Sequence, residues 1–223
     1  DEVKTDPFAQ LRHEMVEKQI IRRGVMDERV LEAMRTVPRH LFVPKEHLSN
    51  AYEDFPLPIG SGQTISQPYI VAYMTEQLAL KGDEKVLEVG TGSGYQAAIL
   101  AQLVQQVHTV EYIPELAERA ASRFREMGIE NIQVHVSDGS LGWPEAAPYQ
   151  AILVTAAAPA APQALLDQLD VEGRMIVPVG ERFQQVLELW QKDRHGLHCQ
   201  SILPVVFVPL KGKQGWNPED LAP

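Results

Sequence analysis

A short apolar run, a cluster of glycines and a helical pattern follow one another between Val86 and Val104, and this order constrains the fold most strongly. The run Val86–Val89 has the length and composition of a buried strand, and glycines stand at positions 90, 92 and 94. Glycines at a strand-to-helix turn let the backbone bend sharply and let a ligand approach the main chain. The free N–H groups at the start of the next helix, Tyr95–Val104, lie at the same turn. The sequence therefore predicts a strand–turn–helix unit that binds a ligand.

Strand and helix patterns alternate through the rest of the chain. Further strands are predicted at 107–110, 132–136, 151–154 and 175–179, with helices at 114–127 and 161–169. This alternation indicates an α/β fold with a parallel, doubly wound sheet. Two final runs, 185–191 and 203–210, flank the turn 193–196 and predict an antiparallel hairpin. A mostly parallel doubly wound sheet that ends in an antiparallel hairpin is typical of Rossmann-like class I methyltransferases.

The N-terminal quarter of the chain has a different pattern. Apolar residues recur at helical spacing between 11 and 35, and a turn interrupts them at Gly24 and Asp27. Four prolines between 38 and 58 then indicate a loop-rich stretch. We expect residues 1–60 to form a helical cap or lid on a core of residues 61–223, within one structural domain overall. A polar, glycine-bearing segment, 60–68, precedes a predicted helix at 69–80.

Charge and composition exclude several classes of protein. The 30 acidic and 20 basic residues give a net charge of −10, so the chain lacks the basic footprint of a nucleic-acid binder. Its single cysteine, Cys199, cannot form an internal disulfide, and we expect it to be a small strand residue. The longest apolar stretch, 151–166, contains two prolines and is too short to span a membrane. Residues 1–10 lack the apolar core of a signal peptide. We expect a monomeric, cytoplasmic protein.

The glycine spacing distinguishes between two kinds of cofactor. A dinucleotide-binding G-x-G-x-x-G pattern that begins at Gly90 would require a sixth-position glycine, where this chain has Tyr95. An acid, Glu88, also precedes the glycines inside the strand. A carboxylate there would repel a pyrophosphate, but it suits a ligand that carries an ammonium and a sulfonium. The pattern therefore favours S-adenosylmethionine over a nicotinamide cofactor.

Two more acids stand at the ends of the next two predicted strands. Glu111 follows Gly90 by 21 residues, where a carboxylate can accept hydrogen bonds from ribose hydroxyls. Asp138-Gly139 ends the third strand, where a carboxylate could meet an adenine amino group. Each has a plainer interpretation: Glu111 as an exposed strand-end carboxylate, and Asp138-Gly139 as a common turn. Because parallel strands end at one crevice, we expect all three acids to lie near the ligand.

Several segments resemble those of protein-L-isoaspartate O-methyltransferases. They are residues 62–68 (Gly-Gln-Thr-Ile-Ser-Gln-Pro), 86–94, 138–159 and 206–210 (Val-Phe-Val-Pro-Leu), together with 23–44 near the N-terminus. The resemblance covers nearly the whole chain in order. Many methyltransferases share the glycine loop, whereas the Thr-Ile-Ser-x-Pro segment and the Val-Pro-Leu end are much more specific to this family. At Lys211, some members carry a threonine.

The resemblance implies a site and an activity. We expect methyl transfer from S-adenosylmethionine to the free carboxylate of L-isoaspartyl residues in damaged proteins and peptides, with S-adenosylhomocysteine as the product. The expected cofactor site comprises Thr64, Ile65, Ser66, Gln67, Glu88, Gly90, Thr91, Gly92, Glu111, Tyr112, Asp138 and Gly139. The expected catalytic residue is Ser66, and the expected substrate-binding residues are Thr64, Ser66, Val206 and Val208. The family resemblance also implies a rearranged order of the last two strands.

The residues themselves suit such a reaction. A carboxylate acceptor, with a pKa near about 4, is already ionised at neutral pH and needs no general base. Ser66 would then orient the acceptor by donating a hydrogen bond, although a serine before Pro68 could instead cap the following helix. No nucleophilic triad is recognisable, and the seven histidines show no metal-ligand set: the pair His195 and His198 lies at a predicted hairpin turn.

The sequence leaves three alternative functions open. The chain could be a methyltransferase that acts on a small molecule or a nucleic-acid base, although Thr155–Pro159 offers no amide to hold an exocyclic amine. It could be a nicotinamide-dependent oxidoreductase, which Tyr95 and Glu88 disfavour. It could also be a cofactor-binding module without catalysis, which only an assay distinguishes.

Overall fold

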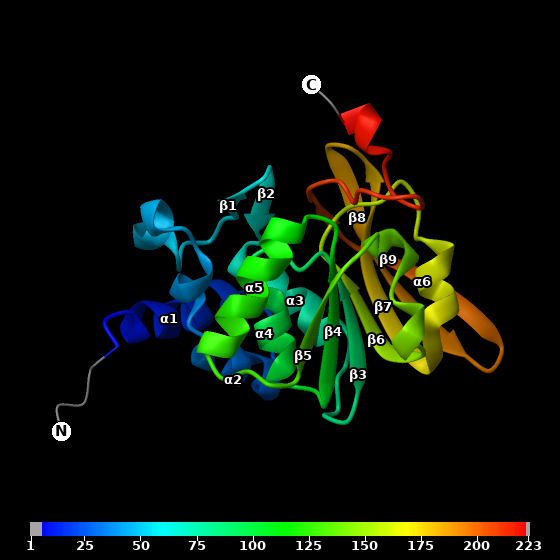
Figure 1. The fold of residues 1–223 in the computed structure, drawn as a ribbon. Helices are drawn as coiled ribbons and strands as arrows, with labels where there is room; N and C mark the ends of the chain where they lie inside the picture. The colour runs from blue at the N-terminus through cyan, green and yellow to red at the C-terminus, as the bar shows by residue number, and fades with distance from the viewer. Residues whose placement is uncertain (1–5, 222–223) are drawn as a thin grey trace.

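The computed structural model describes residues 6–221, in which a seven-stranded sheet forms the centre (Figure 1). Across the sheet the order is β5-β4-β3-β6-β7-β8-β9. The strands are β3 (Lys85–Val89), β4 (Gln106–Glu111), β5 (Ile132–Val136), β6 (Tyr149–Val154), β7 (Leu169–Glu181), β8 (Gln184–Asp193) and β9 (Gly196–Val205). Strands β3 to β7 pair in parallel, whereas β7, β8 and β9 pair antiparallel. The expected mostly parallel sheet with a closing antiparallel hairpin is confirmed, and β8 and β9 lie in chain order.

Helices cover both faces of this sheet (Figure 1). They are α3 (Pro68–Gln77), α4 (Tyr95–Ala101) and α5 (Pro114–Glu126) on one face and α6 (Gln163–Gln168) on the other. Each face has its own apolar core: Val86 of β3 packs toward α4 and α5, and Leu87 packs toward α6. A strand buried on both faces is apolar at nearly every position, which explains why Val86, Leu87 and Val89 are apolar and Glu88 is the one exception in this run.

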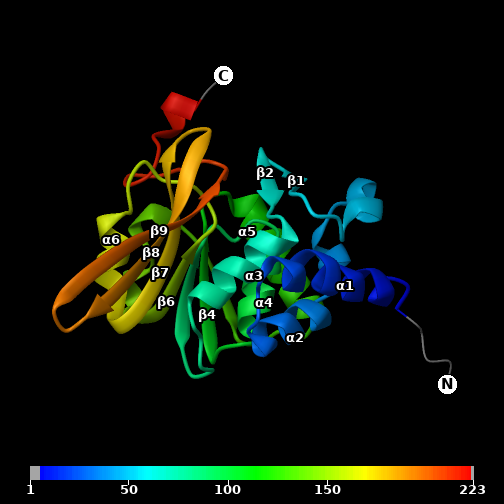
Figure 2. The ribbon, with the colours of Figure 1, turned by 180° about the vertical axis from the view of Figure 1, so that it is seen from behind.

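The N-terminal segment is helical, as expected. It contains α1 (Ala9–Met15), a π-helical turn (Val16–Ile20), a 3-10 turn (Ile21–Arg23) and α2 (Glu28–Thr36). Gly24, with φ of 93°, ends the first part, and the Asp27 side chain caps α2 by accepting from the backbone N–H of Arg29. Figure 2 shows α1 and α2 beside α3 and α4, and their apolar residues belong to the same core. The expectation about residues 1–10 concerns in part residues 1–5, which lie outside the described residues.

The structure corrects several predicted boundaries, and the strand expected at 175–179 is the longer β7. The helix expected to reach Leu169 ends at Gln168, because Leu169 begins β7 and pairs with Tyr149. The last strand, expected at 203–210, spans Gly196–Val205. The residues that follow leave the sheet because their backbone makes hydrogen bonds outside the strand ladder. The N–H of Phe207, for example, donates to the side-chain Oε1 of Gln185. The polar segment expected before α3 contains a hairpin of β1 (Leu57–Gly60) and β2 (Gln63–Ile65). These strands are too short for a periodic sequence pattern.

Cys199 lies in β9 as a strand residue, and its side chain is exposed. Among residues 6–221, no helix is both long and apolar enough to cross a membrane. The division at residue 60 stays a prediction.

Gly94 fixes how closely helix α4 approaches helix α5. Its φ is 89°, and a Cβ added there would lie 2.8 Å from the Phe124 ring. We expect Gly94→Ala to lower the free energy of unfolding by about 2 kcal/mol, from backbone strain and from displacement of Phe124. Gly128→Ala is the matched control, because Gly128 is also left-handed (φ 67°) and a Cβ would have no neighbour within 4 Å. Denaturant unfolding measures both, and equal losses would contradict a packing role for Gly94.

Candidate active site

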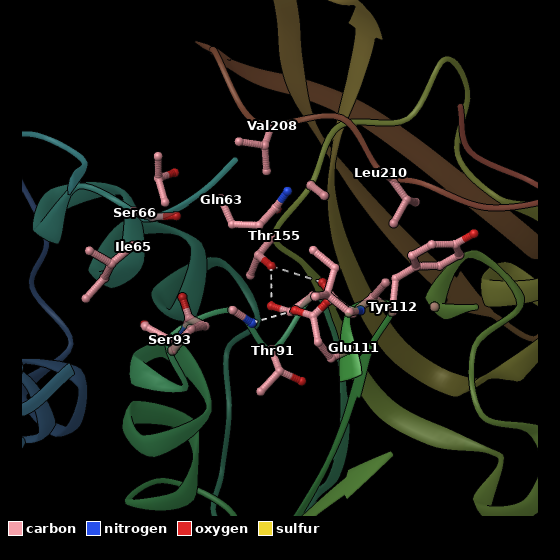
Figure 3. Close-up of a pocket in the computed structure, with 18 of the residues that line it drawn as sticks. Gln63, Ile65, Ser66, Thr91, Ser93, Glu111, Tyr112, Thr155, Val208 and Leu210 are labelled. Atoms are coloured by element: carbon pink, nitrogen blue, oxygen red, sulfur yellow. Dashed lines mark hydrogen bonds between the residues drawn. The ribbon is translucent and has the colours of Figure 1, made fainter. Parts of the chain in front are cut away.

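A cavity opens where β3, β4 and β6 end, and Figure 3 shows its lining. The glycine loop between β3 and α4 forms one wall. The β1–β2 hairpin and the segment 206–211 form the others. Of the expected site residues, those that line this cavity are Thr64, Ile65, Ser66, Gly90, Thr91, Gly92, Glu111, Tyr112, Gly139 and Val208. The fold thus brings five separate parts of the chain to the edge that the sequence pattern predicted.

The residue that follows β6 stabilises the conformation of the glycine loop. Gly90 and Gly92 have φ values of 95° and 52°, which glycine adopts without strain. Thr155, directly after β6, places its Oγ1 2.6 Å from the carbonyl oxygen of Gly90 (Figure 3). A Cβ at Gly90 would lie 2.4 Å from Thr155 Oγ1, so a larger residue would displace the Thr155 side chain and would also be strained at this φ. The loop therefore presents a fixed backbone surface to the cavity.

Glu111 connects the end of β4 to this loop. One carboxylate oxygen accepts from the N–H of Gly92 at 2.8 Å, and the other accepts from the N–H of Ile113 at 3.0 Å. The side chain lines the cavity and the residue is 6% exposed, so the interpretation as an exposed strand-end carboxylate is wrong. An ionised carboxylate has about four acceptor positions, and two therefore remain for hydroxyl groups of a ligand.

Glu88 lies beneath the glycine loop rather than on the cavity wall. It is fully buried, and its Oε2 has no hydrogen-bond partner among the described residues. The Thr109 hydroxyl lies 2.5 Å from Glu88 Oε1 and 2.6 Å from the hydroxyl of Thr91, which lines the cavity. Burial raises the pKa of Glu88 to about 8, so the group is mostly protonated at neutral pH. The expected contact between Glu88 and the cofactor stays a prediction, and the observed link runs through Thr109 and Thr91.

The raised pKa of Glu88 makes stability fall as the pH rises. In the unfolded chain the group has already lost its proton near pH 4.5, whereas the folded protein keeps it until about pH 8. The free energy of unfolding therefore decreases in the window between these values and is lowest above pH 8. We expect Glu88→Gln to remove this dependence and to gain about 1 kcal/mol relative to the parent between pH 7 and pH 9. Urea unfolding at pH 7 and at pH 9 measures the free energy of unfolding of both proteins. A difference between variant and parent that is the same at both pH values would contradict the buried neutral state of Glu88.

Asp138 also lies outside the cavity lining. Its carboxylate accepts from the N–H and the hydroxyl of Ser140 and from the N–H of Lys213. The interpretation of Asp138-Gly139 as a turn therefore describes the local structure, while the neighbouring Gly139 does line the cavity. The same contact holds the C-terminal loop, so that Lys211 reaches the cavity wall. Contact between Asp138 and an adenine stays a prediction.

Ser66 does not cap helix α3. The N-cap residue is Gln67, and no side chain accepts from the first N–H groups of this helix. Within residues 6–221 the Ser66 hydroxyl has no hydrogen-bond partner, and it faces the cavity (Figure 3). Gln67 instead donates to Asp54 at 2.7 Å, and Asp54 pairs with Arg23. The capping interpretation is wrong, and the hydroxyl is available to a ligand.

A second, wider hollow, which we call the groove, adjoins the cavity. Cavity and groove share Thr64, Ser66, Val208 and Pro209. Val206 and Gln67 line the groove only. All four residues expected to bind substrate, which are Thr64, Ser66, Val206 and Val208, therefore lie along the groove.

Comparison with known proteins gives the family. A family model described as protein-L-isoaspartate(D-aspartate) O-methyltransferase matches residues 10–215. The chain belongs to this family. It is 54% identical to protein-L-isoaspartate O-methyltransferase 1 of Syntrophobacter fumaroxidans over 210 residues, which cover 94% of this chain and 98% of the relative. A Methanoculleus marisnigri protein-L-isoaspartate O-methyltransferase is 53% identical over 217 residues, covering 97% and 99%.

Solved structures agree with this isoaspartate methyltransferase assignment. One protein-L-isoaspartate O-methyltransferase superposes with a TM-score of 0.83 at 32% identity, covering 92% of this chain and 67% of the other. A Plasmodium falciparum protein of the same description, in complex with S-adenosyl-L-homocysteine, superposes with a TM-score of 0.78 at 25% identity, covering 92% and 99%. The Rossmann-like methyltransferase fold is confirmed.

The cavity of this isoaspartate methyltransferase fits S-adenosylmethionine. A Cβ at Gly92 would fill the space between Ile59 and the Thr64 carbonyl, so the missing side chain leaves room at the loop. Glu111 supplies acceptors for hydroxyl groups, and Ile113 supplies an apolar surface beside it. These groups match a ribose and an adenine.

The sequence patterns did not identify several residues that line the cavity or the groove of this isoaspartate methyltransferase. Thr155 and Ile113 could have been found, because each follows a parallel strand at the edge where ligands bind. Arg182 and Phe183, which line the groove, carried no signal. They lie in the two-residue turn between β7 and β8, and no sequence pattern places that turn near Ser66.

Proposed function

We propose that this isoaspartate methyltransferase transfers the methyl group of S-adenosylmethionine to the free carboxylate of L-isoaspartyl residues in damaged proteins and peptides, with Ser66 at the point of transfer. The observation that supports this role is the position of Ser66. Its hydroxyl lies where the cavity meets the groove and has no partner within residues 6–221. A cofactor in the cavity and a peptide in the groove would meet there.

The reaction requires no proton transfer. An acceptor carboxylate is ionised at neutral pH, and one oxygen forms a bond to the methyl carbon while the carbon–sulfur bond breaks. The electron pair of that bond remains on sulfur, so the products are a methyl ester and S-adenosylhomocysteine. Holding the three atoms in line contributes up to about 7–11 kcal/mol in favourable intramolecular reactions. The enzyme therefore acts by positioning.

Different residues of the cavity and the groove position the acceptor, the peptide and the cofactor. Ser66 donates a hydrogen bond to the acceptor oxygen that does not react, and Thr64 and Val208 border it. Val206 contacts the main chain of the peptide in the groove. Glu111 and the glycine loop hold the cofactor, while Thr155 and Thr109 keep that loop in place.

The product ester initiates repair. A backbone nitrogen displaces methanol from the ester to form a succinimide, and hydrolysis of the succinimide returns part of the chain to aspartate. We further propose a monomeric enzyme in the cytoplasm, because one chain lines both the cavity and the groove and its single cysteine forms no internal disulfide.

Two peptides that differ only in one linkage test the function. One peptide contains a normal aspartyl residue and the other an isoaspartyl residue at the same position. We expect methyl transfer from labelled S-adenosylmethionine to the isoaspartyl peptide alone, as a base-labile ester. Equal labelling of both peptides, or labelling of neither, would instead favour a different acceptor.

A further inference from the structure

The turn between β7 and β8 forms the outer wall of the groove. It consists of Arg182 and Phe183, between the paired residues Glu181 and Gln184. In Figure 1 this turn lies at the same end of the sheet as the β1–β2 hairpin, which carries Thr64. Any peptide whose isoaspartyl carboxylate reaches Ser66 must therefore place neighbouring residues near this turn.

One buried side chain fixes the turn relative to the site. Gln185 is 4% exposed, and its Nε2 donates to the carbonyl oxygens of Glu181 and Arg182 at 2.7 and 3.0 Å. Its Oε1 accepts from the N–H of Phe207 at 2.8 Å. The turn and the segment that carries Val206 and Val208 are thus held together by one amide group. The wall of the groove is a braced element and not an independent loop.

The turn presents apolar surface to the groove. Phe183 is 78% exposed and Val206 is 70% exposed, and both face the groove together with Ile70 and Phe207. Two large apolar groups exposed in the same hollow are typical of a surface that another chain covers. An apolar side chain of the substrate would remove part of this surface from water.

The turn also carries a charged side chain that lines the groove. Among the described residues that line the groove, Arg182 is the one charged residue. It lies on a chain whose net charge is −10, and its guanidinium carbon lies 5.5 Å from the centre of the Phe183 ring. A positive group at this place attracts an acidic neighbour of the isoaspartyl residue and repels a basic one.

We propose that Arg182 and Phe183 determine which isoaspartyl sequences this enzyme prefers. Phe183 contacts an apolar residue that flanks the isoaspartyl residue, and Arg182 favours an acidic flanking residue over a basic one. This inference rests on the proposed function, because the isoaspartyl carboxylate at Ser66 sets the position of the peptide. The occupant of the groove is therefore the substrate peptide itself.

The test uses isoaspartyl peptides whose flanking residues on both sides are alanine, leucine, glutamate or lysine. For the parent enzyme we expect kcat/KM to be about fivefold higher with glutamate than with lysine, as for an exposed ion pair. Arg182→Glu should reverse this preference. Leucine flanks should give about fivefold higher kcat/KM than alanine flanks, and Phe183→Ser should remove that advantage.

Two control variants make the same chemical changes away from the groove. Arg194→Glu reverses a charge in the exposed turn between β8 and β9, and Met26→Ser removes an apolar side chain that is 81% exposed. Both should keep the parent preferences. If Arg182→Glu and Phe183→Ser also keep them, the proposed selectivity is wrong while the methyltransferase function stands.

Binding separates the two proposals. Fluorescence anisotropy of the same labelled peptides, with S-adenosylhomocysteine present, requires no methyl transfer. Flank-dependent binding without turnover would support the role of the turn and contradict the proposed function. Binding and turnover that are both independent of the flanking residues would overturn the inference.

Discussion

Replacement of Glu111 by alanine is expected to raise the dissociation constant for S-adenosylmethionine about 100-fold. The Glu111 carboxylate holds the N–H groups of Gly92 and Ile113, and both residues line the cavity. Hydrogen bonds to a charged group contribute roughly 1.5–3 kcal/mol each. The variant loses the acceptors for the ribose hydroxyls and also releases the glycine loop, so both effects weaken binding.

Calorimetric titration with S-adenosylhomocysteine measures this loss. Glu115→Ala is the matched control, because Glu115 is an exposed acid in the first turn of α5 and makes the same change in charge. We expect the control to bind within about twofold of the parent. A Glu111→Ala protein that is folded and binds as tightly as the control would contradict the role of Glu111.

Ser66→Ala is expected to lower kcat about 30-fold without changing the fold. The Ser66 hydroxyl makes no capping hydrogen bond to α3, so its removal leaves no backbone group without a partner. The variant loses one hydrogen bond to a charged acceptor, which contributes roughly 1.5–3 kcal/mol. Because about 1.4 kcal/mol of activation free energy corresponds to a tenfold change in kcat, this loss gives the expected decrease. The melting temperature and the affinity for S-adenosylhomocysteine should remain those of the parent.

Single-turnover methylation of an isoaspartyl peptide measures the effect. Ser66→Thr keeps a hydroxyl and should recover part of the rate. Ser201→Ala removes an exposed hydroxyl from β9, away from the cavity and the groove, and should have no effect. A folded Ser66→Ala enzyme with the parent's kcat would show that Ser66 is not the residue that orients the acceptor.

Sequence patterns located the cofactor edge of the sheet. The strand–glycine–helix unit at 86–104 and the acid at Glu111 are local signals, because glycine spacing and apolar periodicity reflect backbone geometry within a few residues. Parallel strands all end at one edge, so Glu111 and Gly139 could be placed together without knowing the packing. Both line the cavity. Thr64, Ile65 and Ser66 were found through the family resemblance, since their short hairpin has no periodic signal.

The protonation and partners of the acids were decided by the tertiary structure. Glu88 was expected to present a negative charge to the cofactor, yet burial beneath the loop raises its pKa to about 8. The Asp138 carboxylate accepts from the N–H of Lys213, 75 positions later in the chain. A carboxyl group's charge depends on how much water and which donors surround it, and distant segments supply both.

The sequence by itself determined the fold class and the cofactor edge of this protein, because both are encoded in spacing along the chain, and its motifs indicated the family by resemblance. Only the tertiary structure decided that the Ser66 hydroxyl makes no capping hydrogen bond to α3 and lies where the cavity meets the groove. It also brought the turn at Arg182 and Phe183 to that groove through Gln185. Such contacts join residues far apart in sequence, and their packing leaves no periodic trace that a local pattern could reveal.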